Sequence, residues 1–255
     1  MNLDWPIMKS KVVLITGVAG GIGSATADLF GREGWHVVGV DREGSRPSTV
    51  DHFIQADISD ADSSANIFRE VGSEEGRLDA LVNNAAIQIC KPVVEMSPDE
   101  WDATMASNLR SVFLAVQNAH SLLQDGGAIV NVSSVHAVAT SSEISAYAAS
   151  KGGLLAFTRA LSIEFADDDI RVNAVLPGAV DTEMLRDGID RGHVEGKSVE
   201  ERIRGLGERH VIGRIGQPEE IAQTILFLAD GDRSSFVTGQ ALTVDGGATA
   251  RLSTE

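Results

Sequence analysis

Apolar runs alternate with helix-like segments along most of this chain, and no other feature constrains its fold so strongly. Seven short runs rich in β-branched residues predict buried strands, at residues 11–17, 36–41, 53–58, 78–86, 127–133, 170–176 and 241–244. Helical periodicity is found at residues 21–33, 60–71, 98–123, 145–165 and 218–229. Such alternation is typical of a parallel sheet covered by helices on both faces. We therefore predict a doubly wound α/β sheet of about seven parallel strands in a single domain over residues 1–255.

Composition excludes several classes of function. The chain is 43% hydrophobic, which suffices for a buried core, and its net charge of −16 repels phosphate backbones and anionic lipid. No apolar run reaches the ~18 residues that a membrane span needs, and the first residues are not typical of a signal peptide. The single cysteine, Cys90, allows no intrachain disulfide and is interpreted as a small apolar side chain. We expect a cytoplasmic enzyme for a small molecule, with no nucleic acid, membrane or metal bound.

A glycine-rich segment separates the first predicted strand from the first predicted helix. It contains Gly17, Gly21, Ile22 and Gly23, with the spacing Gly-x-x-x-Gly-x-Gly rather than Gly-x-Gly-x-x-Gly. Glycines let the backbone approach a pyrophosphate, and the N-terminus of the helix attracts its charge. The position of this segment between strand and helix predicts a dinucleotide site.

Side chains at the ends of the next predicted strands favour NAD as that dinucleotide. Asp41 ends the second strand, where a carboxylate accepts hydrogen bonds from a ribose diol and repels a 2′-phosphate. Arg42 follows directly, and its guanidinium could bind that phosphate, stack on the adenine or lie in solvent, so NADP is the less favoured alternative. Two further pairs are expected at the cofactor, Asp57 and Ile58 beside the adenine, and Asn84 and Ala85 along the cleft.

Tyr147 and Lys151 lie four residues apart and so share one face of the predicted helix 145–165. An ammonium beside a phenol favours the phenolate, and it would lower the pKa of the tyrosine from about 10 toward neutrality. A lone Tyr-x-x-x-Lys is more often a helix face with a lysine that reaches solvent. Here Tyr147 is the only tyrosine of the chain, and a nucleotide loop precedes it. The pair, with Ser134 upstream, therefore predicts acid–base chemistry.

Together these residues resemble the short-chain dehydrogenase/reductase family over nearly the whole chain. The marks, in order, are Thr16 to Gly23, Asn83-Asn84-Ala85, Asn108, Ser133-Ser134, Tyr147 with Lys151, and Pro177-Gly178 followed by Thr182. One departure is Ala86, where many members carry glycine. The resemblance implies a Rossmann-type fold and hydride transfer between NAD(P) and a secondary alcohol or carbonyl.

The resemblance also implies a role for each residue of the site. Tyr147 would be the general acid/base, Ser134 would hydrogen-bond the reacting oxygen, and Lys151 would hold the nicotinamide ribose. Asn108 would position a water in a proton relay. Four residues after the sixth strand would lie at the nicotinamide, namely Pro177, Gly178, Val180 and Thr182.

The substrate is expected among the segments after the fourth, fifth and sixth strands. Gln88 and His136 could hydrogen-bond hydroxyls, and residues 133–136 resemble the stretch found in sugar 1-dehydrogenases such as glucose dehydrogenases, so we predict a sugar or polyol. A 3-oxoacyl thioester is the alternative, because basic residues are available at Arg186, Arg191 and Lys197. A protein that senses NAD without turnover is a further alternative.

Two further expectations concern a segment that covers the substrate and the oligomeric state. Residues 182–214 are polar and interrupted by glycine, which favours a segment that covers the substrate over a disordered surface insertion. Family members are commonly homotetramers, and the resemblance implies packing between copies through helices 98–123 and 145–165, with the last strand in a second interface. The apolar faces of these helices could equally be buried within one subunit.

Overall fold

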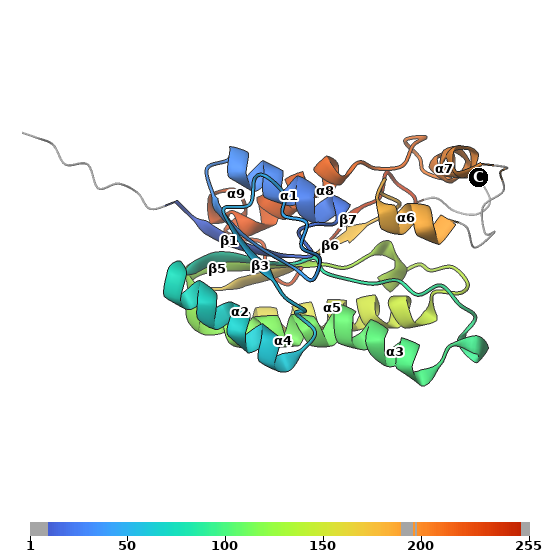
Figure 1. The fold of residues 1–255 in the computed structure, drawn as a ribbon. Coiled ribbons are helices and arrows are strands. Elements are labelled where there is room, and N and C mark those ends of the chain that lie inside the picture. Colours follow the sequence, from blue (N-terminus) through green and yellow to red (C-terminus); the bar gives the residue numbers. More distant parts are fainter. Residues whose placement is uncertain (1–9, 190–195, 197, 251–255) are drawn as a thin grey trace, which may run out of the picture.

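A seven-stranded parallel sheet, in the order β3-β2-β1-β4-β5-β6-β7, forms the centre of the computed structural model, which describes residues 10–189, 196 and 198–250 (Figure 1). The strands are β1 Val12–Thr16, β2 His36–Asp41, β3 His52–Gln55, β4 Leu78–Asn83, β5 Leu123–Val132, β6 Arg171–Pro177 and β7 Ala241–Val244. The strand order reverses between β1 and β4, so the sheet is doubly wound. The predicted fold class is confirmed.

Helices cover both faces of the sheet (Figure 1). One layer contains α1 Gly21–Arg32, α8 Pro218–Ala229 and α9 Gly231–Ser234, and the other contains α2 Ala61–Glu74, α3 Pro98–Met105, α4 Ser111–Ala119 and α5 Ser145–Glu164. Two more helices, α6 Glu183–Gly188 and α7 Val199–Gly207, lie beyond the carboxyl ends of the strands. Short 3-10 turns are η1 Val93–Glu95, η3 His120–Leu122, η4 Val135–Ala137 and η5 Ala166–Asp168, and η2 Ala106–Arg110 is a π-helical turn.

The inner strands β1, β4 and β6 are buried on both faces, which explains their continuous apolar runs, whereas the edge strand β7 is largely exposed. Along β1, Val13 and Ile15 pack in the cluster under α1 and α8, while Val12 and Leu14 pack in the cluster under α2, α4 and α5. The sheet therefore lies between two layers of helices. The loops that carry the polar motifs lie at the carboxyl ends of its strands.

A buried polar chain crosses this core below the motifs. The Asn83 amide donates to Asn131 Oδ1 at 2.9 Å, and the Asn131 amide donates to Thr158 Oγ1 at 2.9 Å. These three side chains are at most 4% exposed. They join β4, β5 and α5 through hydrogen bonds whose loss would leave polar groups unsatisfied in a water-free interior.

Boundaries were predictable where capping chemistry is explicit. Pro218 begins α8 beside Gln217 and Glu220, and Asp60 caps α2 by accepting from Ser63 N. Segment 98–123 is one continuous path through α3, the π turn, α4 and a 3-10 turn, not simply a short helix followed by a long one. The third and fourth strands end earlier than predicted, at Gln55 and Asn83, because the chain there turns into the loops of the site. No helix in the described ranges is long and apolar enough to cross a membrane.

Candidate active site

A cleft of about 1100 Å³ opens at the carboxyl ends of the strands. Ligands bind at this edge in doubly wound sheets. The predicted site residues that line it are Gly17, Gly21, Ile22, Asp41, Arg42, Asp57, Ile58, Asn84, Ala85, Gln88, Ser134, His136, Tyr147, Lys151, Pro177, Gly178, Val180 and Thr182. Two predicted residues, Gly23 and Asn108, lie behind its wall.

The glycine loop is fixed by close backbone packing. Gly17 has φ +68°, and a Cβ there would meet Ala85 Cα at 2.8 Å. A Cβ at Gly23 would stand 2.1 Å from the Gly17 carbonyl oxygen. Gly23 therefore permits the close approach of α1 to the loop, and its contact with the cofactor stays a prediction. The Asn84 amide donates to Thr16 O and Gly17 O, both at 3.0 Å.

The N-terminus of α1 suits the pyrophosphate of a dinucleotide. Gly20 is the N-cap, it offers no side-chain acceptor, and the first turn of α1 contains no acidic residue. Both Gly20 and Gly21 line the cleft. The first-turn N–H groups are therefore available to an anion, and the residues present fit a bound dinucleotide.

Asp41 lies beside this loop at the end of β2. Its Oδ2 accepts from Ala19 N at 2.9 Å and its Oδ1 from Glu43 N at 3.1 Å, so the carboxylate is held in one orientation at the cleft. A hydrogen bond from Ser59 and the charge of Arg42, acting against burial, hold the pKa of Asp57 below its usual value. Arg42 thus interacts with a carboxylate of the protein itself.

The segment after β6 closes against the glycine loop. Val180 forms a parallel bridge with Gly216, and Thr182 caps α6 by accepting from Leu185 N at 3.3 Å. The methyl group Cγ2 of Thr182 lies 2.9 Å from the position that a Cβ at Gly21 would take. Residues from the two halves of the sheet therefore meet over one cleft.

Ser134, Tyr147 and Lys151 come together on the floor of this cleft. Ser134 follows β5, whereas Tyr147 and Lys151 project from α5, and their exposures are 6%, 8% and 2%. The hydroxyl of Ser134 lies close enough to the Tyr147 phenol to act on its pKa. Lys151 Nζ donates to Val132 O at 2.8 Å and lies 5.6 Å from the centroid of the Tyr147 ring. The predicted juxtaposition of phenol and ammonium is present.

Burial dominates the electrostatics of this pair. It raises the pKa of Tyr147 to about 12, against the hydrogen bond from Ser134, which acts to lower it. Burial also lowers the pKa of Lys151 to about 8. The expected lowering of the pKa of Tyr147 therefore does not come from the protein's own groups, because desolvation of the phenolate outweighs them.

Asn108 lies in the π turn η2 and is fully buried. Its Oδ1 accepts from Ile87 N at 2.8 Å, and its amide donates to Ile87 O at 2.9 Å and to Ser150 Oγ at 3.2 Å. The Ser150 hydroxyl in turn donates to Tyr147 O at 2.7 Å. The side chain of Asn108 is thus bonded to Ile87 and Ser150, and its part in a proton relay stays a prediction that would fall to its main chain.

The substrate end of the cleft lies beside Tyr147. The His136 ring meets the Tyr147 ring edge-on, with centroids 6.1 Å apart, and Gln88 lies along the same wall. The Ser141 hydroxyl is buried without a hydrogen-bond partner among the described residues. Cys90 also lines the cleft, where its thiol acts to raise the pKa of Tyr147.

Several residues of the site were missed by sequence reasoning. Ser150 is three positions from Tyr147, and this spacing on a helix was the available signal. Arg209 lies within the predicted covering segment 182–214 but was not singled out in it; it lines the cleft just beyond the end of α7. Leu206 and the α6 residues Met184 and Leu185 line the same region.

Comparisons with known proteins agree with this geometry. A family model described as "Enoyl-(Acyl carrier protein) reductase" matches residues 17–249. The chain is 39% identical to 3-oxoacyl-(acyl-carrier-protein) reductase FabG of Thermotoga maritima, covering 94% of this chain and 98% of that protein. It is 37% identical to cyclopentanol dehydrogenase of Comamonas, covering 95% and 98%. The ligand-free aldohexose dehydrogenase of Thermoplasma acidophilum superposes with a TM-score of 0.89 at 32% identity, covering 96% of both chains.

The fold and the comparisons define an oxidoreductase that uses NAD(P) to transfer a hydride between a small-molecule alcohol and a carbonyl. The chain belongs to the short-chain dehydrogenase/reductase family.

Proposed function

We propose that this enzyme oxidises a secondary alcohol with NAD, and that a sugar or polyol is the first candidate substrate. The observation that carries the proposal is the burial of Ser134, Tyr147 and Lys151 together on the floor of the dinucleotide cleft. A protein that only senses NAD has no use for this acid–base set, which argues against the non-catalytic alternative.

Each residue of the set has a distinct task. Ser134 hydrogen-bonds the reacting oxygen, and Tyr147 takes the proton from the substrate hydroxyl or returns it to the carbonyl. Lys151 holds the nicotinamide ribose and supports the phenolate. When bound, the oxidised dinucleotide supplies the hydride acceptor and a positive charge in the cleft.

The raised pKa of Tyr147 sets how much stabilisation of the phenolate this arrangement must supply at neutral pH. Bringing the pKa of Tyr147 from about 12 to about 7 requires roughly 7 kcal/mol of preferential phenolate stabilisation, at about 1.36 kcal/mol per unit. In a desolvated site a single charge a few Å away is worth several kcal/mol. Rotation of the Lys151 ammonium from Val132 O toward the phenol, together with the cationic cofactor, provides stabilisation of this size.

The side chains at the adenosine end support NAD. The Asp41 carboxylate is oriented at the cleft by Ala19 N, where it accepts from the ribose diol and repels a 2′-phosphate. The charge of Arg42 helps to hold the pKa of Asp57 below its usual value, so a carboxylate of the protein competes with a phosphate for it. We assign Asp57 and Ile58 to the adenine, Asn84 and Ala85 to the cleft wall, and Pro177, Gly178, Val180 and Thr182 to the nicotinamide.

The substrate proposal rests on the polar groups beside Tyr147. Gln88 and His136 line the cleft there and can hydrogen-bond hydroxyls, and the name of the aldohexose dehydrogenase is consistent with a sugar. Reduction of a 3-oxoacyl thioester is the second candidate, because of the FabG relative. Of the basic residues offered for it, Arg186 is paired with Asp181 at 2.8 Å, and Arg191 and Lys197 lie outside the described residues.

We further propose that residues 182–214 cover the substrate. This segment carries α6 and α7, and Met184, Leu185 and Leu206 from these helices line the cleft. One domain over residues 1–255 then carries both the cofactor site and its cover. A chain with one cysteine needs no oxidising compartment, and we propose a cytoplasmic location.

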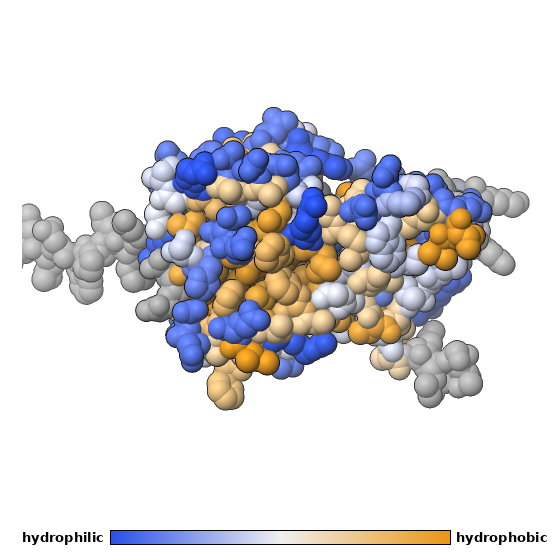
Figure 2. All heavy atoms as spheres, turned by 90° about the horizontal axis from the view of Figure 1, so that it is seen from below, coloured by the Kyte–Doolittle hydropathy of each residue, from blue (hydrophilic) through white to orange (hydrophobic). Residues whose placement is uncertain are grey.

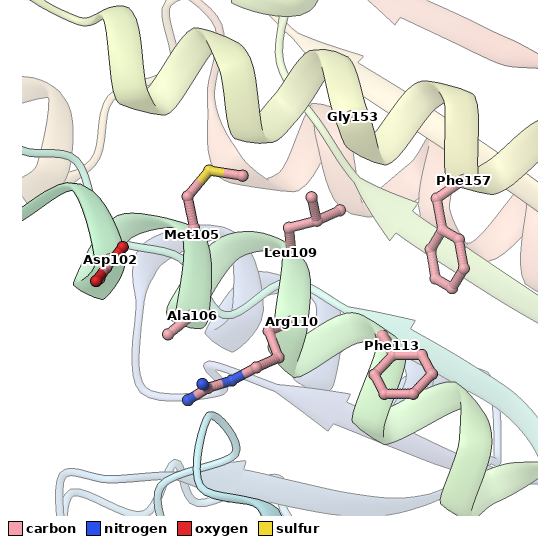
Figure 3. Close-up of a pocket in the computed structure, with 8 residues that line it drawn as sticks. All are labelled: Asp102, Met105, Ala106, Leu109, Arg110, Phe113, Gly153 and Phe157. Atoms are coloured by element: carbon pink, nitrogen blue, oxygen red, sulfur yellow. The ribbon is translucent and has the colours of Figure 1, made fainter.

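An apolar surface favours assembly into a homotetramer. Figure 2 shows apolar side chains gathered at the centre of the face formed by the α2–α5 layer. Two helices of this layer carry exposed apolar side chains, since Phe113 of α4 is 46% and Ile163 of α5 is 77% exposed. A groove of about 640 Å³ lies between η2–α4 and α5 (Figure 3). Its lining residues are Asp102, Met105, Ala106, Leu109, Arg110, Phe113, Gly153 and Phe157.

The charges on this groove suit a two-fold pairing. Asp102 and Arg110 lie on the same helical path, two turns apart, so an antiparallel copy would place unlike charges opposite each other. The exposed Phe236 and Leu242 near β7 offer a second interface. Light scattering should show a tetramer, and Phe113→Asp should reduce it to smaller species.

A substrate panel tests the enzymatic proposal. Sugars, polyols and secondary alcohols are incubated with NAD while the absorbance of the reduced nicotinamide is followed, with Tyr147→Phe as the inactive variant. We expect turnover of a sugar or polyol and a loss of at least about 100-fold in kcat in the variant. Reaction only with 3-oxoacyl thioesters would remove the sugar assignment, and parental rates in Tyr147→Phe would remove the mechanism.

A further inference from the structure

Arg209 is the only positively charged side chain at the substrate end among the described residues that line the cleft. The other two cations of the cleft, Arg42 and Lys151, belong to the adenosine end and to the floor. In the ranges that the structure describes, the guanidinium of Arg209 has no hydrogen bond and no ion pair, and only its main-chain N–H is bonded, to Leu206 O at 3.1 Å. A cation without a partner thus faces the cavity in which the substrate is bound.

Two other arginines near this end of the cleft are paired within the chain, whereas Arg209 is not paired in the part that the structure describes. Arg186 binds Asp181 through two hydrogen bonds of 2.9 and 3.1 Å, and Arg214 binds Glu220 through two of 2.8 Å. With a net charge of −16, carboxylates are abundant on this surface. The position of Arg209 therefore keeps its guanidinium available to an anion from outside the chain.

The backbone that carries Arg209 is anchored, so an anion need not order it first. The next residue, His210, is 4% exposed, and its Nδ1 lies 2.9 Å from Leu206 O. Ile212 N donates to Gly246 O at 3.2 Å, which ties the segment to the end of β7. Preorganisation of this kind saves the ordering cost of binding.

We propose that Arg209 binds a carboxylate of the substrate, so that the enzyme acts on anionic secondary alcohols. The planar guanidinium fork matches a carboxylate through two parallel hydrogen bonds. Apolar side chains, Leu206 and the α6 residues Met184 and Leu185, line the same end and accommodate the carbon skeleton between that carboxylate and the carbinol at Tyr147. The inference rests on the proposed dehydrogenase function and narrows it to hydroxy acids, which include both sugar acids and ring hydroxy-carboxylates.

Two acidic side chains, Glu183 and Asp187, also line this end, on α6. They repel an anion and so oppose Arg209. Removal of one of these charges is therefore expected to act in the opposite direction to removal of the arginine. This opposition makes the sign of each substitution informative.

The test compares matched substrates with and without the charge. The probes are 4-hydroxycyclohexanecarboxylate and its methyl ester, and an aldonate with the corresponding alditol, each with NAD. Arg209→Gln should raise the KM ratio of carboxylate to neutral partner by about 10-fold or more, and Asp187→Asn should lower it. Arg204→Gln, an exposed arginine on α7 outside the cleft, is the matched control and should leave the ratio unchanged.

Three outcomes would overturn the inference. They are an unchanged ratio in Arg209→Gln, no turnover of any carboxylate by the parent enzyme, and an effect of Arg209→Gln confined to 3-hydroxyacyl coenzyme A, whose phosphates would then be the anion. Tyr147→Phe separates the two levels of the proposal. If that variant is inactive while Arg209→Gln does not discriminate, the carboxylate assignment fails and the dehydrogenase function stands.

Discussion

The amide of Asn108 donates a hydrogen bond to the hydroxyl of Ser150 at 3.2 Å, and through it reaches the main chain of Tyr147. The Ser150 hydroxyl in turn donates a hydrogen bond to Tyr147 O at 2.7 Å. The π turn that carries Asn108 is thereby tied to the first turn of α5, and the loop after β4 is tied to both through Ile87. The position of the acid–base tyrosine therefore depends on residues that never touch the cleft.

Replacement of Ser150 tests this dependence. Ser150→Ala leaves the buried Asn108 amide short of an acceptor, and we expect a loss of about 1–2 kcal/mol in unfolding free energy. We also expect a fall of about 3- to 30-fold in kcat and a displaced basic limb of the pH–rate profile, because Tyr147 is less well held. Ser162→Ala is the matched control, since Ser162 donates to Arg159 O in the same helix without contacting Asn108. Equal pH profiles for the parent and Ser150→Ala would contradict the positioning role.

Removal of the buried ammonium should separate stability from activity. The pKa of Lys151 in the folded protein, about 8, lies below its ordinary 10.5, so at neutral pH the folded state pays for a buried charge. Lys151→Met removes this cost and loses the hydrogen bond to Val132 O, for an expected net gain of about 1–2 kcal/mol and roughly 2–6 °C in Tm. Activity should disappear.

The sign of the pH dependence follows from the same shift. In the parent enzyme this penalty is complete below pH 8 and fades as the pH rises toward 10.5, so the advantage of Lys151→Met should shrink over that range. Thermal melts at about pH 7 and about pH 10 measure it. A lower Tm than the parent at pH 7 would rule this account out.

Cofactor preference should respond to the end of β2. Asp41→Ala removes the carboxylate that faces the ribose and the repulsion of a 2′-phosphate. With Glu43→Arg added, we expect the ratio of kcat/KM for NAD to that for NADP to fall by about 100-fold. Glu33→Arg, which adds a similar charge away from the cleft, controls for net charge. If Asp41→Ala, alone or with Glu43→Arg, leaves this ratio equal to that of the parent enzyme, Asp41 does not contact the ribose.

The unfolding free energy should also depend on pH through His52, which lies between two carboxylates at the start of β3, away from the cleft. His52 contacts Glu70 at 2.9 Å and Glu75 at 3.0 Å, and although burial opposes the cation, these hydrogen bonds raise the pKa of His52 above 6.5. Its contribution is fully present below pH 6.5 and is lost as the pH rises through the raised value. The Tm difference between the parent and His52→Gln should therefore be larger at about pH 5.5 than at about pH 9. His120→Gln, at an exposed pair with Asp168, is the control and should show a smaller change.

The sequence was most informative where local chemistry decides the structure. Continuous apolar runs predict the buried strands. Proline and acidic residues in the first turn predict the start of α8, so these elements agree closely with the prediction. The glycine loop was equally readable, because a Cβ at Gly17 would stand only 2.8 Å from Ala85 Cα and glycine avoids this clash. At Gly23 the sequence could not separate two roles, since a packing contact and a ligand contact both favour glycine.

Other features depend on contacts between distant segments and left no local signal. The raised pKa of Tyr147 comes from burial in the finished fold, which the spacing to Lys151 does not reveal. Arg209 is set apart by its place at the cleft, which only the folded chain reveals. The commitment of the Asn108 side chain to Ile87 and Ser150 likewise requires the π turn to be in place.

The buried run of amides and hydroxyl from Asn83 through Asn131 to Thr158 has a dynamic consequence. Because each of these groups satisfies the next in a water-free interior, opening any one of the three elements exposes unpaired groups in the other two. Amide protons of β4, β5 and α5 should then exchange with solvent through one shared opening event. The floor beneath the nucleotide and the helix that bears the proton-transfer pair would thus behave as one cooperative unit, which opens as a whole or stays closed.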